Sequence, residues 1–230
     1  MLFVFEDRPS DSPFVERIWR TRSERAGAFT SVAVCQWEMV VTRHNGAATL
    51  TVRGPETRAT PALIPQDAEF LGITFKLGAL LPHLPPRHLV DGAVTLPDAA
   101  RCSFWLGGAM WPCPDYDNAE TFVARLARDG LLLFDPVVQA ALHGRPRERS
   151  VRSVQRRFVH ATGLTQSAIW QIERARRAAA LLTGGVPILD TVDQAGYFDQ
   201  PHLTRELRRL IGQTPAQILR SGESAYLALA

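Results

Sequence analysis

The chain has 230 residues, of which 46% are hydrophobic and 21% are charged. This composition is typical of a packed globular protein and excludes a disordered one, and the length allows one large domain or two small ones. The three cysteines, Cys35, Cys102 and Cys113, show no C-x-x-C spacing, which argues against a zinc ribbon or a redox pair. Neither a signal peptide nor an apolar run long enough to span a membrane is found, so a cytoplasmic protein with free thiols is expected.

The formal net charge of +3 is unevenly distributed along the sequence. Residues 1–144 contain 13 Lys+Arg and 16 Asp+Glu, a net charge of −3, whereas residues 145–220 contain 13 Arg and 6 Asp+Glu, a net charge of +7. Glu223 accounts for the remaining −1. A basic segment attracts polyanions, and arginine suits two-pronged contacts with phosphate and guanine. The change of sign predicts two domains with different partners, although a solvated basic surface would give the same count.

Strand-like patterns dominate the N-terminal part after a short helical one. Apolar residues at positions 14–19 predict one short helical face. Residues 29–41 are rich in valine, threonine and aromatics, residues 44–46 suit a hairpin turn, and residues 47–52 suit the returning strand. Residues 68–75 predict a further strand. Together these patterns favour a β-rich domain, a small barrel or sandwich.

The middle of the chain is rich in proline, glycine and leucine. Residues 78–114 predict short helical turns at best, with a turn at Gly107-Gly108, and residues 112–118 suit a linker. A helix is expected from Asn118 to residue 129. Another is expected from Asp135, an N-cap followed by Pro136, to Gly144.

The C-terminal part predicts short helices that each begin at a capping residue. Two of them carry an apolar stripe on one face and arginines on the opposite face; one starts at Ser150 and the other at Asp199. A longer amphipathic helix lies between them. The expected helices cover residues 150–163, 165–183, 188–195, 199–211 and 214–220.

This doubled pattern resembles the AraC/XylS family of bacterial transcription regulators, over roughly residues 120–220. One helix-turn-helix pattern would be a weak signal, but two in order, with a linker helix between them, are specific. The residues that carry the resemblance are Ser150, Arg152, Gln155, Arg156, Phe158, Thr162 and Gly163, then residues 174–179, 195–200, Leu203, Arg205, 212–215 and Arg220.

The resemblance implies a multidomain α+β protein whose residues 118–220 form an all-α DNA-binding domain. Its two helix-turn-helix units, joined by the linker helix, would each place one helix in the major groove of double-stranded DNA. By position, Arg152, Gln155 and Arg156 match the first reading helix. Those that match the second, or share its polar face, are Gln200, Thr204, Arg205 and Arg208.

The resemblance also implies a role for residues 1–115. Family members commonly carry a β-rich sensing or dimerising domain there, often a cupin-like barrel, and residues 70–78 resemble a segment of such domains. A small-molecule effector, a homodimer and contact with RNA polymerase are therefore expected, and residues 221–230 form a tail. Trp37, Phe70 and Phe75 are the candidates for lining an effector pocket, although an ordinary aromatic core would use the same residues.

No catalytic or metal-binding constellation is visible in the sequence. The six histidines form neither H-x-H nor H-E-x-x-H, and no glycine-rich phosphate loop or G-x-S-x-G elbow occurs. Neither a cofactor nor a metal is expected, and an enzyme is disfavoured. The remaining alternative is a protein that binds or sequesters a small molecule without regulatory DNA binding.

Overall fold

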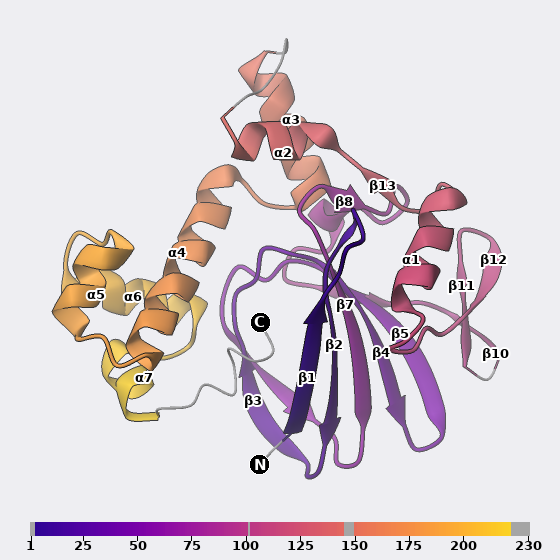
Figure 1. Ribbon diagram of the computed structural model, residues 1–230, viewed down its shortest axis with the longest axis horizontal. Helices are drawn as coiled ribbons and strands as arrows, with labels where there is room; N and C mark the ends of the chain where they lie inside the picture. Colours follow the sequence, from indigo (N-terminus) through magenta and orange to yellow (C-terminus); the bar gives the residue numbers. More distant parts are fainter. Residues whose placement is uncertain (1–2, 101, 145–149, 222–230) are drawn as a thin grey trace. The chain divides into compact units, whose positions relative to one another are not determined.

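The computed structural model describes residues 3–100, 102–144 and 150–221, which divide into two compact units (Figure 1). Unit 1 contains residues 1–27, 36–55 and 64–165, and unit 2 contains residues 28–35, 56–63 and 166–230. This division differs from the boundary expected near residues 115–118. The helices of the first helix-turn-helix belong to the same unit as the large sheet, and two short segments of the N-terminal half belong to the other.

Unit 1 is built on a six-stranded antiparallel sheet. In spatial order its strands are β1 (Phe3–Pro9), β2 (Val15–Ser23), β7 (Glu69–Phe75), β4 (Glu38–His44), β5 (Ala47–Arg53) and β9 (Ala93–Thr95). The sheet is open, with β1 and β9 at its edges, so the strands in the described part of the chain do not show the closed, cupin-like barrel that the family resemblance implied.

The predicted hairpin is confirmed by β4 and β5. Asn45 and Gly46 form the turn with backbone φ angles of 51° and 76°, the left-handed values of a two-residue hairpin turn. The predicted strand at residues 68–75 is likewise confirmed as β7.

The helical face predicted at residues 14–19 is wrong, because residues 15–19 lie in strand β2. The pairing of β2 with β7 shifts register between Val15 and Arg17, and the extra residue of such a bulge turns the following side chains to the other face. Val15 and Ile18, three residues apart, consequently share the core. The bulge thus gives two core residues of a strand the three-residue spacing that is typical of a helix face.

The strand predicted over residues 29–41 is two separate strands in different units. β3 (Gly27–Ser31) pairs with β6 (Thr60–Ile64), whereas β4 joins the large sheet. We call residues 28–35 and 56–63, which belong to unit 2, the ribbon. A bridge between Val34 and Glu56 extends the pairing of the ribbon beyond its two strands.

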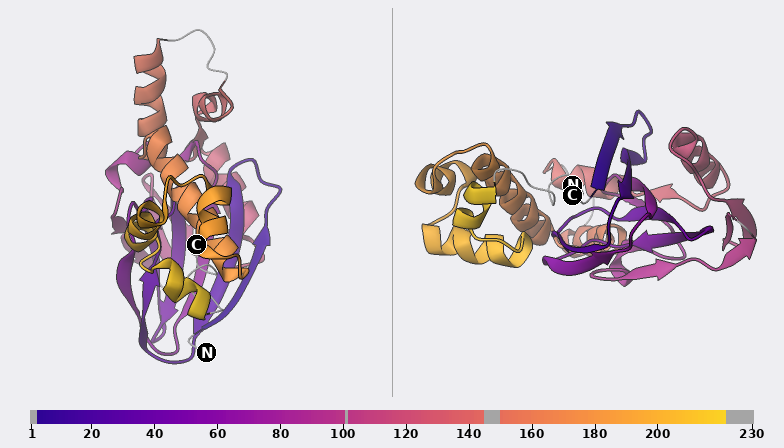
Figure 2. Two further views of the ribbon diagram at one scale, coloured as in Figure 1. Left: turned by 90° about the vertical axis from the view of Figure 1, so that its left-hand side faces the viewer. Right: turned by 90° about the horizontal axis from the view of Figure 1, so that it is seen from below.

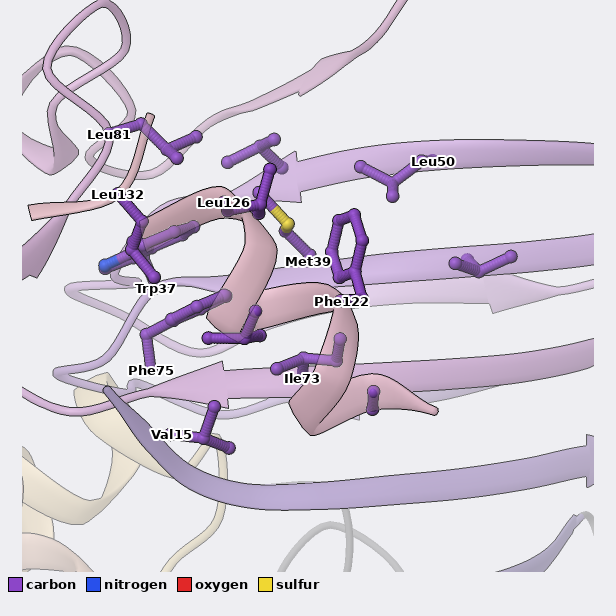
Figure 3. Close-up of a cluster of buried hydrophobic side chains, with 14 of the residues drawn as sticks. Val15, Trp37, Met39, Leu50, Ile73, Phe75, Leu81, Phe122, Leu126 and Leu132 are labelled. Atoms are coloured by element: carbon purple, nitrogen blue, oxygen red, sulfur yellow. The ribbon is translucent and has the colours of Figure 1, made fainter. Parts of the chain in front are cut away.

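Helix α1 (Ala119–Arg128) covers one face of the large sheet, as Figure 3 shows. Its buried residues include Phe122, Val123 and Leu126. Asn118 occupies the N-cap position without a side-chain capping bond. Instead, a carboxylate oxygen of Asp115 accepts the backbone N–H groups of Asp117 and Asn118.

Residues 78–114 contain more strand than the sequence indicated, because strands of two to four residues are too short to show alternation. They include β10 (Asp98–Ala100), β11 (Ser103–Leu106) and β12 (Ala109–Pro112), with Gly107-Gly108 as the confirmed turn. β8 (Ala79–Leu80) pairs with β13 (Leu133–Phe134), and a 3-10 turn spans Pro86–His88. The buried rings of Phe104 and Trp111 meet Phe122 of α1 edge-on.

The predicted helices of the C-terminal part are confirmed to within a residue or two. Unit 1 contains α2 (Pro136–Leu142) and α3 (Val151–Thr162). In unit 2, Figures 1 and 2 show α5 (Ile188–Ala195), α6 (Gln200–Leu210) and α7 (Pro215–Ser221) packed about α4 (Gln166–Thr183). Residues 145–149 and, apart from Ser221, the predicted tail lie outside the described residues.

Candidate nucleic-acid interface

Helix α3 turns one face to the core and the opposite face to solvent. Its first residues are capped by Ser150, whose hydroxyl accepts the backbone N–H of Ser153 at 3.3 Å. Val154 and Phe158 are buried. The side chains predicted to contact DNA from this helix are all exposed and fall on one face; they are Arg152, Gln155 and Arg156.

The orientation of α3 against α2 is fixed by one carboxylate. Asp135 caps α2 by accepting the backbone N–H of Val137 at 3.0 Å. The same side chain receives two hydrogen bonds from Arg157 of α3, at 3.0 Å from Nε and 2.7 Å from Nη2. Two-pronged arginine–carboxylate pairs are geometrically specific. Arg157 therefore acts within the first helix-turn-helix, next to the arginines that remain exposed.

Helix α6 has the same organisation as α3. Asp199 caps it by accepting the backbone N–H of His202 at 2.7 Å, and Leu203, Leu207 and Leu210 are buried. Of the four predicted contact residues, Thr204 is half-buried and the other three are exposed; these are Gln200, Arg205 and Arg208.

The hydroxyl of Thr204 is already engaged within its own helix. It donates to the backbone carbonyl of Gln200 at 2.9 Å. In this arrangement the oxygen can still accept a hydrogen bond, and the methyl group can make an apolar contact. Thr204 is thus better suited to accept from a base amino group, or to touch a thymine methyl, than to donate.

The turn between α5 and α6 is held in place by a side chain of α4. Gly196 adopts a left-handed φ of 71°, and the buried ring of Tyr197 lies 4.3 Å from the guanidinium carbon of Arg174. Arg174 also donates to the carbonyl of Gly196 at 3.4 Å. Burial raises the pKa of Tyr197. These contacts fix the turn that leads into α6.

Arg209 differs from Arg205 and Arg208 on α6 because its guanidinium forms hydrogen bonds with several residues of unit 2. Its guanidinium bonds to Glu206 and to the side-chain oxygen of Gln171, the latter at 3.1 Å. It also donates to the backbone carbonyl of Thr57 in the ribbon at 3.5 Å. Arg209 is therefore part of the packing that supports α6, while Arg205 and Arg208 remain available.

The ribbon supplies hydrogen-bond donors to the C-terminal end of α6. The last four carbonyls of a helix have no partner within it. Here the N–H of Ala33 donates to the carbonyl of Leu210, and the N–H of Ala59 donates to that of Arg209, both at 2.8 Å. A side chain at Gly212 would meet Thr30 and Ala59 at 2.8 and 3.2 Å. The ribbon and the end of α6 are thus closely fitted.

Each helix-turn-helix unit contains a capped, amphipathic helix with exposed arginines, and a model of the helix-turn-helix domain family matches residues 148–221. The chain carries an AraC-type helix-turn-helix domain. It is a DNA-binding transcription regulator, as the motifs predicted. Comparison with curated proteins and with solved structures found no match.

The match to the AraC-type domain begins just before α3, so α2 precedes the matched residues. All seven residues predicted to contact DNA lie inside it. The sequence did not predict two features near this domain. One is the ribbon, whose sequence carries no local signal of its partner; the other is the exposure of Phe198, which directly precedes the cap of α6.

Two of the three candidate effector-binding residues come together in the core, and the third lies apart from them. Trp37 and Phe75 are buried and stack in the core of unit 1, with ring centroids 3.9 Å apart (Figure 3), and the indole N–H of Trp37 donates to the carbonyl of Ala79. Phe70 is half-buried on β7. It lies an odd number of residues from Phe75, so it faces the opposite side of the sheet. The tight stack is the packing of an aromatic core.

The described residues contain no group of three or more His, Cys, Asp or Glu side chains placed to hold a metal ion. No helix among them is both long enough and apolar enough to cross a membrane.

Proposed function

We propose that this AraC-type regulator recognises a specific duplex sequence through α3 and α6. The observation that carries the proposal is the shared design of the two helices. Each is capped at its N-terminus, buries an apolar stripe and exposes arginine and glutamine on the other side. The proposed contact residues are Arg152, Gln155 and Arg156 of α3, and Gln200, Thr204, Arg205 and Arg208 of α6.

The chemistry of these side chains suits base recognition. Arginine can donate two hydrogen bonds to O6 and N7 of guanine, and glutamine can pair with N6 and N7 of adenine. Helix α4, with 18 residues, extends about 27 Å at 1.5 Å per residue. This length is comparable to the ~34 Å between successive major-groove segments on one side of a duplex, which supports reading two segments.

The test is a mobility-shift titration with duplexes selected from a random pool by the full chain. Arg156→Ala and Arg205→Ala should each weaken binding by about 1–3 kcal/mol and relax preference at a few neighbouring base pairs. Arg128→Ala, which removes an exposed arginine of α1, is the matched control for charge. Failure of the folded wild-type chain to prefer any selected duplex over random DNA would refute the proposal.

We propose further that the N-terminal half tunes DNA binding through the ribbon. Residues 28–35 and 56–63 are continuous in sequence with strands of unit 1, yet they cap α6 and contact Arg209. An effector or a dimer contact could act on α6 by this route, but only through its different affinity for two arrangements of the ribbon. Homodimerisation through residues 1–115 belongs to the same proposal and is tested by sedimentation of the full chain.

The ribbon is tested by removing its donors in the full chain. Ala33→Pro and Ala59→Pro each delete an N–H that caps α6, and a lost hydrogen bond of about 0.5–1.5 kcal/mol should weaken DNA binding roughly twofold to tenfold. Cys35, which is buried in the ribbon, should react faster with an alkylating reagent. The exposed Cys102 serves as the internal reference. Faster alkylation of Cys35 with unchanged DNA affinity would contradict coupling through the ribbon.

A further inference from the structure

Phe198 is the most exposed large apolar side chain in the described part of the chain, with 90% of its surface accessible. It directly precedes Asp199, the cap of α6. In many helices the residue before the cap packs against the fourth helical residue, which here is Leu203. Leu203 is fully buried while Phe198 is not, so this common apolar contact does not explain the phenylalanine.

The exposure of Phe198 follows from its two neighbours, which are both fixed. Tyr197 is buried beneath the guanidinium of Arg174, and the rings of Tyr197 and His202 meet in a T-shaped contact. Asp199 is held by its capping bond to the N–H of His202. Because the residues on either side are anchored, the backbone cannot turn the aromatic ring inward without losing one of these contacts.

The place of Phe198 is at the end of α6 that a helix-turn-helix directs toward DNA. In this motif the N-terminal residues of the second helix contact base edges in the major groove. The next residue beyond the cap is Gln200, which is exposed, and Arg205 is exposed further along the helix. An aromatic ring among such groups cannot make a salt-dependent phosphate contact, but it can pack on the C5-methyl group of thymine.

We propose that Phe198 is a specificity-determining residue that packs against a thymine methyl group in the DNA segment read by α6. The proposal rests on the proposed function, since it needs sequence-specific binding through α6. It adds an aromatic contact to a surface whose other proposed members would recognise bases chiefly by hydrogen bonds. It also assigns a role to the one exposed aromatic residue next to the helix cap.

The experiment replaces thymines one at a time with deoxyuridine in a duplex selected by the wild-type chain. This change removes only the methyl group and leaves base pairing intact. At one thymine, wild-type binding should weaken about fourfold, the factor that corresponds to one buried methyl group. Phe198→Ala should bind the thymine duplex less tightly and lose its sensitivity to deoxyuridine at that position, whereas Phe198→Leu should keep part of it.

Trp170→Ala provides the control, because Trp170 is also an exposed aromatic residue, 72% accessible, on α4. It should retain the wild-type response to deoxyuridine. Equal losses on thymine and deoxyuridine duplexes for Phe198→Ala would assign the ring to the DNA backbone and overturn the proposal. So would unchanged affinity, a change in oligomeric state instead of affinity, or a selected site in which no thymine methyl matters. Absence of any sequence preference in the wild type would instead refute the proposed function.

Discussion

Single capping residues decide where α2, α3 and α6 begin. Asp199, Ser150 and Asp135 each accept a backbone N–H in the first turn of the helix that follows. These N–H groups have no partner inside the helix, so the side chain fixes both the start of the helix and the direction in which its first residues point. In α6 the first turn carries Gln200, one of the proposed DNA contacts, so under that proposal the cap affects both stability and DNA recognition.

We expect Asp199→Ala to lower the free energy of unfolding by about 0.5–2 kcal/mol. Because the first turn of α6 would fray, DNA affinity should fall as well. Asp199→Asn keeps an oxygen acceptor at the same place and should retain most of both quantities. Urea unfolding and DNA titration of the two variants measure the effects, and equal behaviour of alanine and asparagine would contradict a capping role.

At the scale of elements, shared carboxylates join helices to their neighbours. Asp135 belongs to the cap of α2 and to the pair with Arg157 of α3. Glu120 of α1 receives hydrogen bonds from Arg8 of β1, which also donates to the carbonyl of Tyr116 at 2.9 Å. In each case one side chain sets the relative orientation of two elements that apolar packing alone would leave less defined.

Substitution of Asp135 should lower the free energy of unfolding more than substitution of Arg157, because Asp135 both caps α2 and pairs with Arg157. Asp135→Ala removes the cap and the ion pair and should destabilise the protein by about 2 kcal/mol, and Arg157→Ala by about 1 kcal/mol. Asp135→Asn retains a capping oxygen. Added to Arg157→Ala, it should therefore change the free energy of unfolding very little. Urea unfolding of the single and double variants checks this, and strictly additive losses would show that the pair does not couple α2 to α3.

The pair between Glu120 and Arg8 predicts a pH dependence. Hydrogen bonding by Arg8 lowers the pKa of Glu120, so the folded state holds its proton less tightly than the unfolded chain does. The stabilisation is therefore fully present above the unfolded pKa, about 4.3, and is lost as the pH falls through the folded value.

Urea midpoints measured from neutral to acidic pH test this dependence. Glu120→Gln should flatten the fall in stability below about pH 4.3, and Arg8→Gln should do the same because it removes the partner. An unchanged profile in both variants would show that the pair contributes nothing to acid sensitivity. The effect should also be modest, because both side chains are about a third exposed and solvent screens such pairs.

At the scale of the whole molecule, the second helix-turn-helix is completed by the N-terminal half of the sequence. Unit 2 combines residues 166–230 with the ribbon, and the ribbon contributes the buried residues Val32, Ala33 and Cys35. The thiol of Cys35 lies 3.8 Å from the carbonyl oxygen of Ile169 in α4. The pKa of this thiol is raised, chiefly by burial. The DNA-binding region as drawn from the sequence, residues 118–220, therefore lacks part of the unit that supports α6.

A fragment of residues 118–230 should consequently have a less stable α6 and bind DNA less tightly than the full chain. Without the ribbon, the carbonyls of Arg209 and Leu210 lose their donors and apolar surface of α4 and α6 is uncovered. We expect faster amide exchange in the last turn of α6 and lower DNA affinity at one salt concentration. Adding back a peptide of residues 28–63 should restore part of both. Equal exchange and affinity in fragment and full chain would show that the ribbon is dispensable.

Local chemistry in the sequence determined the C-terminal helices, the β4–β5 hairpin and the AraC-type motif. The capping bonds of Asp135, Ser150 and Asp199 reach atoms within three residues, and Asn45-Gly46 forms its own turn, so these features can be predicted from the sequence alone. Only the tertiary structure decided the rest. The bulge in β2, the stack of Trp37 on Phe75 and the ribbon beneath α6 depend on pairing between distant segments. Such contacts depend on which distant segments meet to bury apolar surface and to satisfy backbone groups, and the apolar periodicity of one segment does not identify its partner.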